Sequence, residues 1–307
     1  MKIAVLQGGP SAEAEVSRKS AKGIVKGIEE LGHEYKLIEC DRAFIANILD
    51  YKPDFVYIAM HGSPGEDGQI QAVLDSLGLP YNGSGTEASI VAFDKALAKQ
   101  VFATYGVSTA PFVIYDAKTG LNTAEINAKV SALGYPVVVK ASRQGSTIGV
   151  YKANNEAELN STITEALKYD NKLVIEKFIP GTELTISLMG NDDIRVLAPI
   201  EIVSHKQFYD YEAKYTVGGS SHQIPPRLDS ALIDKAVNEV IKAHKALGCS
   251  GLSRSEVICT PDGSVNVLEV NTLPGMTELS LYPDAARASG MSFSQMIGEI
   301  IRLGMER

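Results

Sequence analysis

The sequence has few cysteines, no long apolar run and no excess of positive charge, and each shortage argues against a class of protein. Its 3 cysteines, Cys40, Cys249 and Cys259, share no metal-binding or redox spacing, so we expect reduced thiols and a cytoplasmic protein. No apolar stretch approaches the roughly 18 residues that a membrane span needs. The N-terminus lacks the apolar segment of a signal peptide. A net charge of −8 argues against a nucleic-acid-binding surface.

The remaining composition is typical of a soluble α/β protein with more than one domain. Hydrophobic residues make up 45% and charged residues 21% of the chain, and 307 residues predict two or three domains. Up to about residue 94, apolar strand-like runs alternate with helical patterns, as in Lys2–Leu6 followed by a helix from Ala12 to Leu31. This alternation predicts a doubly wound parallel sheet with ligands at the carboxyl ends of its strands.

The pattern changes after residue 94. A helix is predicted up to Gly106, and further on long strand candidates at 182–190, 194–203, 255–260 and 264–270 predict an antiparallel sheet with flanking helices. The stretch Ser204–Gln223 fits neither a helical nor a strand period. A segment of that length within a compact domain predicts a functional lid.

Polar side chains interrupt two apolar strand candidates near the C-terminus. In "VLEVNTLPGMT", Glu269 and Asn271 are two residues apart and therefore share one face of a strand. The stretch by itself slightly favours a half-exposed edge strand. In "GLSRSEV", Arg254 and Glu256 have the same spacing. On neighbouring strands the four residues would suit metal ions bridging a polyphosphate. Apolar neighbours, such as Val257, argue against a surface ion-pair network.

Two further motifs allow more than one interpretation. In "VVVKASRQGSTIGV", the backbone of a Ser/Gly turn beside Lys140 could hold phosphate oxygens. A β-hairpin with a solvated lysine explains this segment equally well. In "IEKFIPGTEL", Glu176, Phe178 and Glu183 would suit a nucleoside, although an ordinary strand–turn–strand is favoured when the segment is taken alone.

A set of motifs in fixed order covers the chain from its first strand to its last helix. They are "GGPSAEAEVS", "HGSPGEDG", "GLPYNGSG", "DKALAKQ", "VKASRQGSTIGV", "FYDYEAKY", "GLSRSEV" and "LEVNTLPGMT" with "SLYPDAARASG". With these segments the chain resembles the D-alanine–D-alanine ligases of the ATP-grasp superfamily. One segment alone is weak, but their order over the full length is highly specific.

The resemblance implies an α/β protein with an ATP-grasp fold. We expect an N-terminal doubly wound domain (1–94), a central subdomain (95–180) and an α+β C-terminal subdomain (181–307) that carries the metal site and the lid. The implied enzyme is an ADP-forming carbon–nitrogen ligase. It would join two D-alanines through an acyl phosphate, for peptidoglycan precursors that serve cell wall biogenesis and cell shape.

The resemblance also implies residue roles for ATP and metal. Two Mg²⁺ ions, for which Mn²⁺ is an expected substitute, would bind Glu256, Glu269 and Asn271. The family usually has aspartate at the position of Glu256, so the metal geometry there is open. The ATP-binding residues would be Lys95, Lys140, Glu176, Lys177, Phe178, Ile179, Glu183, Phe208 and Lys214.

The remaining implied roles concern the two amino acids. Glu13 would pair with the first ammonium group, with Ser146 and Tyr215 linking it to the lid and His61 beside it. Arg254 and the Gly275 N–H would stabilise the developing oxyanion. The second carboxylate would bind at Ser280 and Leu281, where a helix begins, and Lys214 would also face substrate.

Alternative functions follow from the same resemblance. They are a D-alanyl-D-lactate or D-alanyl-D-serine ligase, or a non-catalytic nucleotide-binding protein. The lid segment resembles the dipeptide-forming type, and the metal ligands and Arg254 are retained. Relatives of this kind imply a homodimer, and we expect no membrane or nucleic-acid partner.

Overall fold

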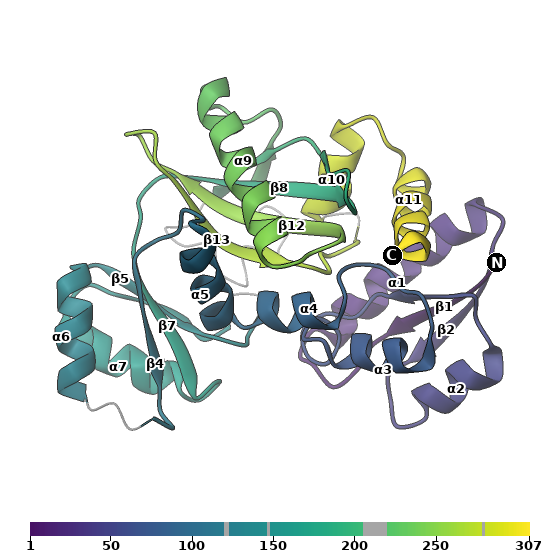
Figure 1. Ribbon diagram of the computed structural model, residues 1–307, viewed down its shortest axis with the longest axis horizontal. Helices are drawn as coiled ribbons and strands as arrows, with labels where there is room; N and C mark the ends of the chain where they lie inside the picture. Colours follow the sequence, from purple (N-terminus) through teal and green to yellow (C-terminus); the bar gives the residue numbers. More distant parts are fainter. Residues whose placement is uncertain (120–122, 146–147, 205–219, 278–279) are drawn as a thin grey trace.

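Three β-sheets and the helices that cover them make up the protein (Figure 1). The computed structural model describes residues 1–119, 123–145, 148–204, 220–277 and 280–307. In Figure 1 the N-terminal sheet lies at the right, the central sheet at the lower left and the C-terminal sheet above them. The combination of one parallel sheet with two antiparallel sheets confirms the predicted fold class.

The N-terminal region contains a parallel sheet in the order β2-β1-β3. Its first strand, β1, has no exposed surface at Ile3, Ala4, Val5 and Leu6, as expected for a parallel strand covered on both faces. Helix α1 packs on one face and helices α2 and α3 pack on the other, so the predicted doubly wound arrangement is confirmed. The elements are β1 (Lys2–Gln7), α1 (Ala14–Glu30), β2 (Glu34–Glu39), α2 (Phe44–Tyr51), β3 (Phe55–Ile58), α3 (Gln69–Leu77) and α4 (Thr86–Phe93).

A four-stranded antiparallel sheet in the order β4-β7-β5-β6 forms the central region. Helices α6 and α7 pack against it and close a hydrophobic core of its own. Helix α5 precedes this sheet in the chain but contributes Phe102 to the core beneath the C-terminal sheet. The elements are α5 (Lys95–Tyr105), β4 (Phe112–Asp116), α6 (Thr123–Leu133), β5 (Val137–Ala141), β6 (Val150–Ala153), α7 (Glu156–Ala166) and β7 (Lys172–Lys177).

The C-terminal sheet has the order β11-β10-β8-β12-β13, with β9 paired to β8. The prediction of one strand over 194–203 is wrong, because two strands, β9 and β10, lie on either side of Pro199. Proline has no N–H to donate to a ladder, which explains the break. The elements are β8 (Thr182–Gly190), β9 (Arg195–Val196), β10 (Ile200–Ser204), β11 (Ser220–Gln223), α9 (Ser230–Ala246), β12 (Gly251–Cys259), β13 (Val265–Asn271), α10 (Leu281–Ala288) and α11 (Phe293–Glu306).

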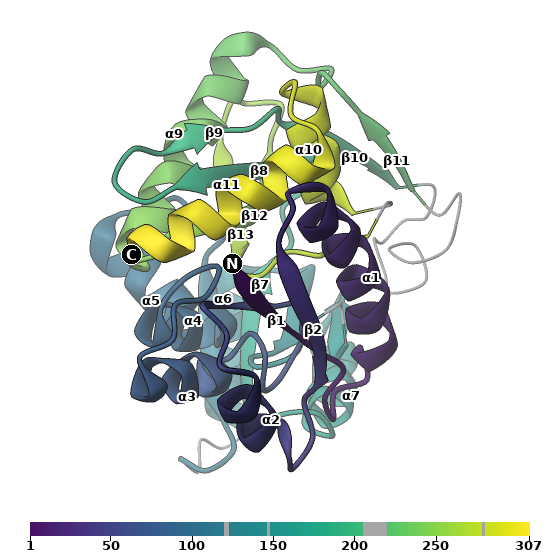
Figure 2. The ribbon, with the colours of Figure 1, turned by 90° about the vertical axis from the view of Figure 1, so that its right-hand side faces the viewer.

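The two ends of the chain pack together. Helix α11 runs beside α1 (Figure 2), and a β-carbon at Gly27 of α1 would lie only 3.1 Å from Ile297 Cγ1 of α11. One hydrophobic core therefore includes β1 and α1 together with β12, α10 and α11. The domain limits at residues 94 and 180 stay a prediction. Among the described residues, no helix is both long and apolar enough to cross a membrane.

Candidate active site

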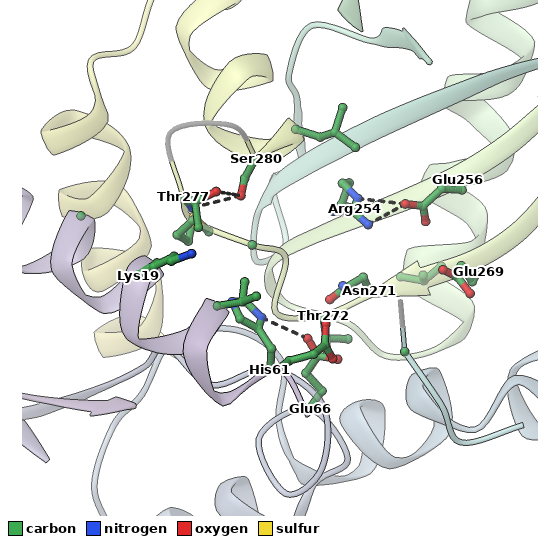
Figure 3. A pocket seen from close by; sticks show the side chains of 18 of the residues that line it. Lys19, His61, Glu66, Arg254, Glu256, Glu269, Asn271, Thr272, Thr277 and Ser280 are labelled. Atoms are coloured by element: carbon green, nitrogen blue, oxygen red, sulfur yellow. Dashed lines mark hydrogen bonds and ion pairs between the residues drawn. The ribbon is translucent and has the colours of Figure 1, made fainter. Parts of the chain in front are cut away.

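A cavity of about 880 Å³ lies where the N-terminal and C-terminal regions meet. Its walls come from the whole length of α1, the loop after β3, strands β12 and β13 and the start of α10, with Lys95 and Gln144 added from the central region. Figure 3 shows side chains from these separate segments around the same space. The lining includes many of the predicted site residues: Glu13, His61, Lys95, Arg254, Glu256, Glu269, Asn271, Gly275, Ser280 and Leu281.

Strands β12 and β13 form the carboxylate wall of this cavity. In their antiparallel register Arg254 lies opposite Asn271, and Glu256 lies opposite Glu269, so the predicted juxtaposition of the four residues is confirmed. Arg254 donates from Nε and Nη2 to Glu256 Oε1, at 3.1 and 2.6 Å (Figure 3). The other oxygen, Glu256 Oε2, is buried and accepts no hydrogen bond from any described residue.

This donor set fits a hard divalent cation. A buried carboxylate oxygen without a hydrogen bond is costly, and a metal ion would satisfy it. Asn271 supplies an amide oxygen, which accepts from Leu273 N at 2.8 Å. Within the described ranges no three His, Cys, Asp or Glu side chains form a ready metal cluster. A cation here would therefore need oxygen ligands from phosphate and water, which is how Mg²⁺ commonly binds.

Lysines of α5 and β5 lie next to this wall. Lys95 Nζ is 3.3 Å from Glu269 Oε2 and donates to the Gln144 carbonyl at 2.7 Å. Lys140 forms an ion pair with Glu176 Oε1, and Lys99 Nζ lies 2.7 Å from Glu176 Oε2. Burial would raise the pKa of Glu176, but the two ammonium groups outweigh it and lower the pKa to about 2. The Glu176 carboxylate is therefore ionised at neutral pH.

The predicted nucleoside residues that the structure describes, Glu176 to Ile179 and Glu183, do not line the cavity described above. They lie on β7, on β8 and in the turn that joins these strands. The Phe178 ring centroid is 4.2 Å from Lys152 Nζ, and Lys177 Nζ donates to the carbonyls of Gly134 and Tyr135 at 2.9 and 3.1 Å. The last members, Ile179 and Glu183, are half-buried.

Acidic side chains also lie beside the start of α1. We call this part of the cavity, with Glu13 and Glu66, the acidic corner. Glu13 is 7% exposed, and β-carbons at Gly62 and Gly145 would lie 3.2 and 3.3 Å from its Oε2, so both glycines leave room for this carboxylate. His61 contacts Ser20 Oγ through Nε2 at 3.1 Å and Glu66 Oε1 through Nδ1 at 3.5 Å. Burial and nearby Glu13 raise the pKa of Glu66 despite the contact with His61.

The start of α10 forms the opposite end of the cavity. Ser280 is the N-cap residue, and its Oγ accepts from Thr277 N at 3.0 Å. A β-carbon at Gly275 would lie 2.9 Å from this oxygen, so the close approach requires glycine. The first N–H groups of a helix favour an anion, which suits a carboxylate bound beside Leu281.

Some predicted residues cannot be placed, and some placed residues were not predicted. Ser146, Phe208, Lys214 and Tyr215 lie outside the described residues, as does most of the predicted lid. Lys99 and Glu66 were missed. Glu66 belongs to the quoted "HGSPGEDG" loop together with its partner His61. Lys99 follows Lys95 by four residues in a predicted helix, but its partner Glu176 is distant in the sequence.

Comparisons with known proteins identify the family. The family described as "D-ala D-ala ligase C-terminus" matches residues 101–302. The D-alanine–D-alanine ligase of Moorella thermoacetica is 44% identical over 308 residues, covering 100% of both chains. The chain belongs to the D-alanine–D-alanine ligase family. Its relative from Halalkalibacterium halodurans is also 44% identical, with 100% coverage of both chains.

Solved structures of ligases share the fold. The D-alanine–D-alanine ligase of Bacillus anthracis, solved as a complex with ATP, superposes with a TM-score of 0.87 at 30% identity and covers 100% of this chain and 98% of that one. The VanG D-Ala:D-Ser ligase of Enterococcus faecalis gives 0.85 at 30% identity, with 99% of each chain covered. Family membership thus assigns the chain to ATP-dependent ligases.

Proposed function

We propose that this protein joins two molecules of D-alanine to D-alanyl-D-alanine while converting ATP to ADP and phosphate. The observation that carries the proposal is that one cavity joins an acidic corner, a carboxylate wall with an arginine, and a helix N-terminus. These three features match an ammonium group, a phosphoryl group with its cation, and a carboxylate. The full-length identity to D-alanine–D-alanine ligases supports the choice of substrates.

In this proposal ATP binds between the central and C-terminal sheets. Lys95, Lys140 and Lys214 neutralise its phosphates, because ammonium groups act as point charges for phosphate oxygens. The nucleoside is held by Glu176, Lys177, Phe178, Ile179, Glu183 and Phe208. Glu256, Glu269 and Asn271 would hold Mg²⁺, expected as two ions with Mn²⁺ as a substitute. When bound, the metal would neutralise negative charge on the β- and γ-phosphates.

The first D-alanine lies between the acidic corner and the carboxylate wall. Glu13 pairs with its ammonium group, and Ser146 and Tyr215 extend this contact toward the lid. His61, held between Ser20 and Glu66, borders the same subsite. The substrate carboxylate then attacks the γ-phosphorus, the bond to ADP breaks, and an acyl phosphate forms.

The second D-alanine binds with its carboxylate at Ser280 and Leu281. Its amine, once it has lost a proton, attacks the acyl carbon to form a tetrahedral intermediate. Arg254 and the Gly275 N–H stabilise the oxyanion, which is the electrostatic contribution that often dominates such reactions. The carbon–oxygen bond to phosphate then breaks, and the peptide bond remains. The lid excludes water from the acyl phosphate.

The cellular setting belongs to the same proposal. D-alanyl-D-alanine would serve as a peptidoglycan precursor made in the cytoplasm, and the active species would be a homodimer. Size-exclusion chromatography coupled to light scattering measures the oligomeric state directly, and a monomer at micromolar concentration would contradict the dimer.

The deciding experiment measures phosphate release and identifies the product. With ATP and Mg²⁺, D-alanine should give phosphate and a dipeptide in equal amounts, whereas L-alanine should give neither. Mixtures of D-alanine with D-lactate or D-serine test the rival specificities, of which the second is suggested by the likeness to a D-Ala:D-Ser ligase. Mass spectrometry distinguishes the three products. ATP binding without any D-alanine-dependent turnover would favour a non-catalytic protein instead.

A further inference from the structure

Lys99 is a charged side chain that the proposed chemistry does not use, although it is almost completely buried. It lies one helical turn after Lys95 on α5, so the two side chains come from one face of the helix. Only 1% of its surface is exposed. A buried ammonium group is costly unless ionic and hydrogen-bonding partners replace the lost water. The identity of those partners therefore indicates what the charge does.

The first partner of Lys99 belongs to the predicted nucleotide site. Its Nζ lies 2.7 Å from Glu176 Oε2, while Lys140 pairs with the other oxygen of the same carboxylate. One buried carboxylate on β7 thus holds two lysines, one from α5 and one from β5. Fixing one Glu176 oxygen also fixes the direction of the other, and so the position of the Lys140 ammonium group.

The second partner of Lys99 leads to the C-terminal sheet. Nζ donates to Thr109 Oγ1 at 2.5 Å, and the Thr109 hydroxyl donates to the Val267 carbonyl at 2.6 Å. Val267 lies two residues before Glu269 on β13. The Val267 N–H also donates to the Ser108 carbonyl at 2.8 Å. Polar contacts therefore run without interruption from β7, through α5, to the strand that carries the proposed metal ligands.

We propose that Lys99 is a positioning residue for ATP: it holds Lys140, through Glu176, at a fixed spacing from the β13 carboxylate wall, through Thr109. Lys99 itself does not touch the nucleotide. The inference rests on the proposed function, because that function places ATP between these two sheets. The inference adds Lys99 to that function as the residue that sets the position of the Lys140 ammonium group relative to β13, the strand that carries the proposed metal ligands.

The test uses Lys99→Met, which keeps the length of the side chain and removes its charge. The dissociation constant for ATP with Mg²⁺, measured by calorimetry on the full chain, should rise about tenfold, a usual size for coupling between groups of one site. The KM for ATP should rise in parallel, while the KM for D-alanine should stay within about twofold of wild type. If Lys99 served folding alone, Lys99→Met would lower the free energy of unfolding without a rise in KM for ATP that is absent from KM for D-alanine.

Val130→Ala is the matched control for lost stability. Val130 is fully buried in the core of the central region, and it has no part in the lysine–carboxylate contacts. This variant should unfold more easily and bind ATP as wild type does.

Lys99→Met combined with Glu176→Gln should weaken ATP binding by less than the product of the two single effects, because both act on one contact.

Thr109→Val keeps the proposal testable if Lys99→Met does not fold. It retains the ion pair and removes only the hydroxyl, so ATP affinity should fall several-fold. Normal ATP affinity in Lys99→Met, or in Thr109→Val where the first is insoluble, would overturn the inference. If the wild-type protein binds ATP but makes no dipeptide, the proposed function fails, and the calorimetric comparison of variants still decides the role of Lys99.

Discussion

At the scale of single residues, Arg254 is tied to the wall on which the proposed reaction depends. Its guanidinium donates twice to one oxygen of Glu256, a carboxylate that is 4% exposed. The planar fork of arginine can hold that oxygen while other N–H groups face the cavity, which a lysine cannot do. Replacing Arg254 should therefore affect both the reacting groups and the geometry of Glu256, and the two effects have to be measured separately.

Arg254→Ala should lower kcat by about 10²–10³, the usual cost of losing one oxyanion-stabilising donor. The KM for ATP should change much less, because the lysines still bind the phosphates. Arg254→Lys should recover only part of the rate, since the charge returns without the fork. Steady-state kinetics with a melting curve for each variant give the answer. An alanine variant with near-normal turnover, or one that unfolds, would make Arg254 a structural partner of Glu256.

His244 predicts how stability depends on pH. Burial lowers its pKa from 6.5 to about 4. Nδ1 contacts Ser253 Oγ at 2.7 Å, and Nε2 is buried without a hydrogen-bond partner in the described structure. A protonated ring would thus bury an unpaired N–H. The unfolded chain binds the proton more tightly than the folded one. His244 therefore leaves the free energy of unfolding undiminished above pH 6.5 and lowers it as the pH falls toward 4.

Lowering the pH from 7 to 5 should reduce the unfolding free energy of the wild-type protein by about 2 kcal/mol through protonation of His244 in the unfolded chain. His244→Asn keeps a polar atom near Ser253 and removes the titration, so its stability should vary less over the same interval. Urea unfolding at several pH values measures both proteins. Equal slopes for the two proteins would show that other groups control acid sensitivity.

Single residues also show how far a sequence can be interpreted. The period of two along a strand predicted that Arg254 and Glu256 share one face of their strand, and that Glu269 and Asn271 share one face of theirs, because that spacing is local. The register that places Glu256 opposite Glu269 was only inferred from their joint chemistry. Lys99 was not predicted, since its carboxylate partner lies 77 residues away and a lysine in a helix is usually solvated.

At the scale of secondary-structure elements, α5 organises the site through its first residue and its cap. Asp94 accepts from Ala96 N at 3.1 Å, and the Ser142 hydroxyl donates to the same oxygen at 2.5 Å. Lys172 Nζ pairs with its other oxygen at 3.0 Å. One carboxylate therefore caps the helix and attaches it to the central sheet. This attachment sets the position of the two lysines that α5 carries.

Helix ends were more predictable than strand ends. The predicted helix up to Gly106 is observed as α5, where Gly106 has a positive φ of 66° at the C-cap, and such a residue is a local signal in the sequence. The run 194–203 was taken as one strand because its apolar residues continue past Pro199. Both β9 and β10 pair with β8, and Pro199 between them was a local signal for the break that the apolar pattern outweighed.

Across the whole molecule, the N-terminal and C-terminal regions share one hydrophobic core, whereas the central region has a core of its own. One core joins Ile3 of β1 and Ile24 of α1 with Leu252 of β12 and Ile297 of α11. The central region closes its own core around Leu159 and Val137. It is connected to the rest mainly through α5 and the polar contacts of Lys95 and Lys99. The N-terminal and C-terminal regions should therefore open together, and the central region should open separately.

Ile297→Ala removes a fully buried side chain from the shared core and should lower its stability by about 2–5 kcal/mol. Hydrogen exchange should then accelerate in peptides from β1, α1, β12 and α11 and stay unchanged in β5 and β7. Leu159→Ala, fully buried in the central core, should give the reverse pattern. ATP with Mg²⁺ should slow exchange in both groups, because a ligand bound between two units stabilises each against opening. Uniform acceleration of every peptide by both variants would mean that the three regions unfold as one unit, and the nucleotide would then have no separate units to join.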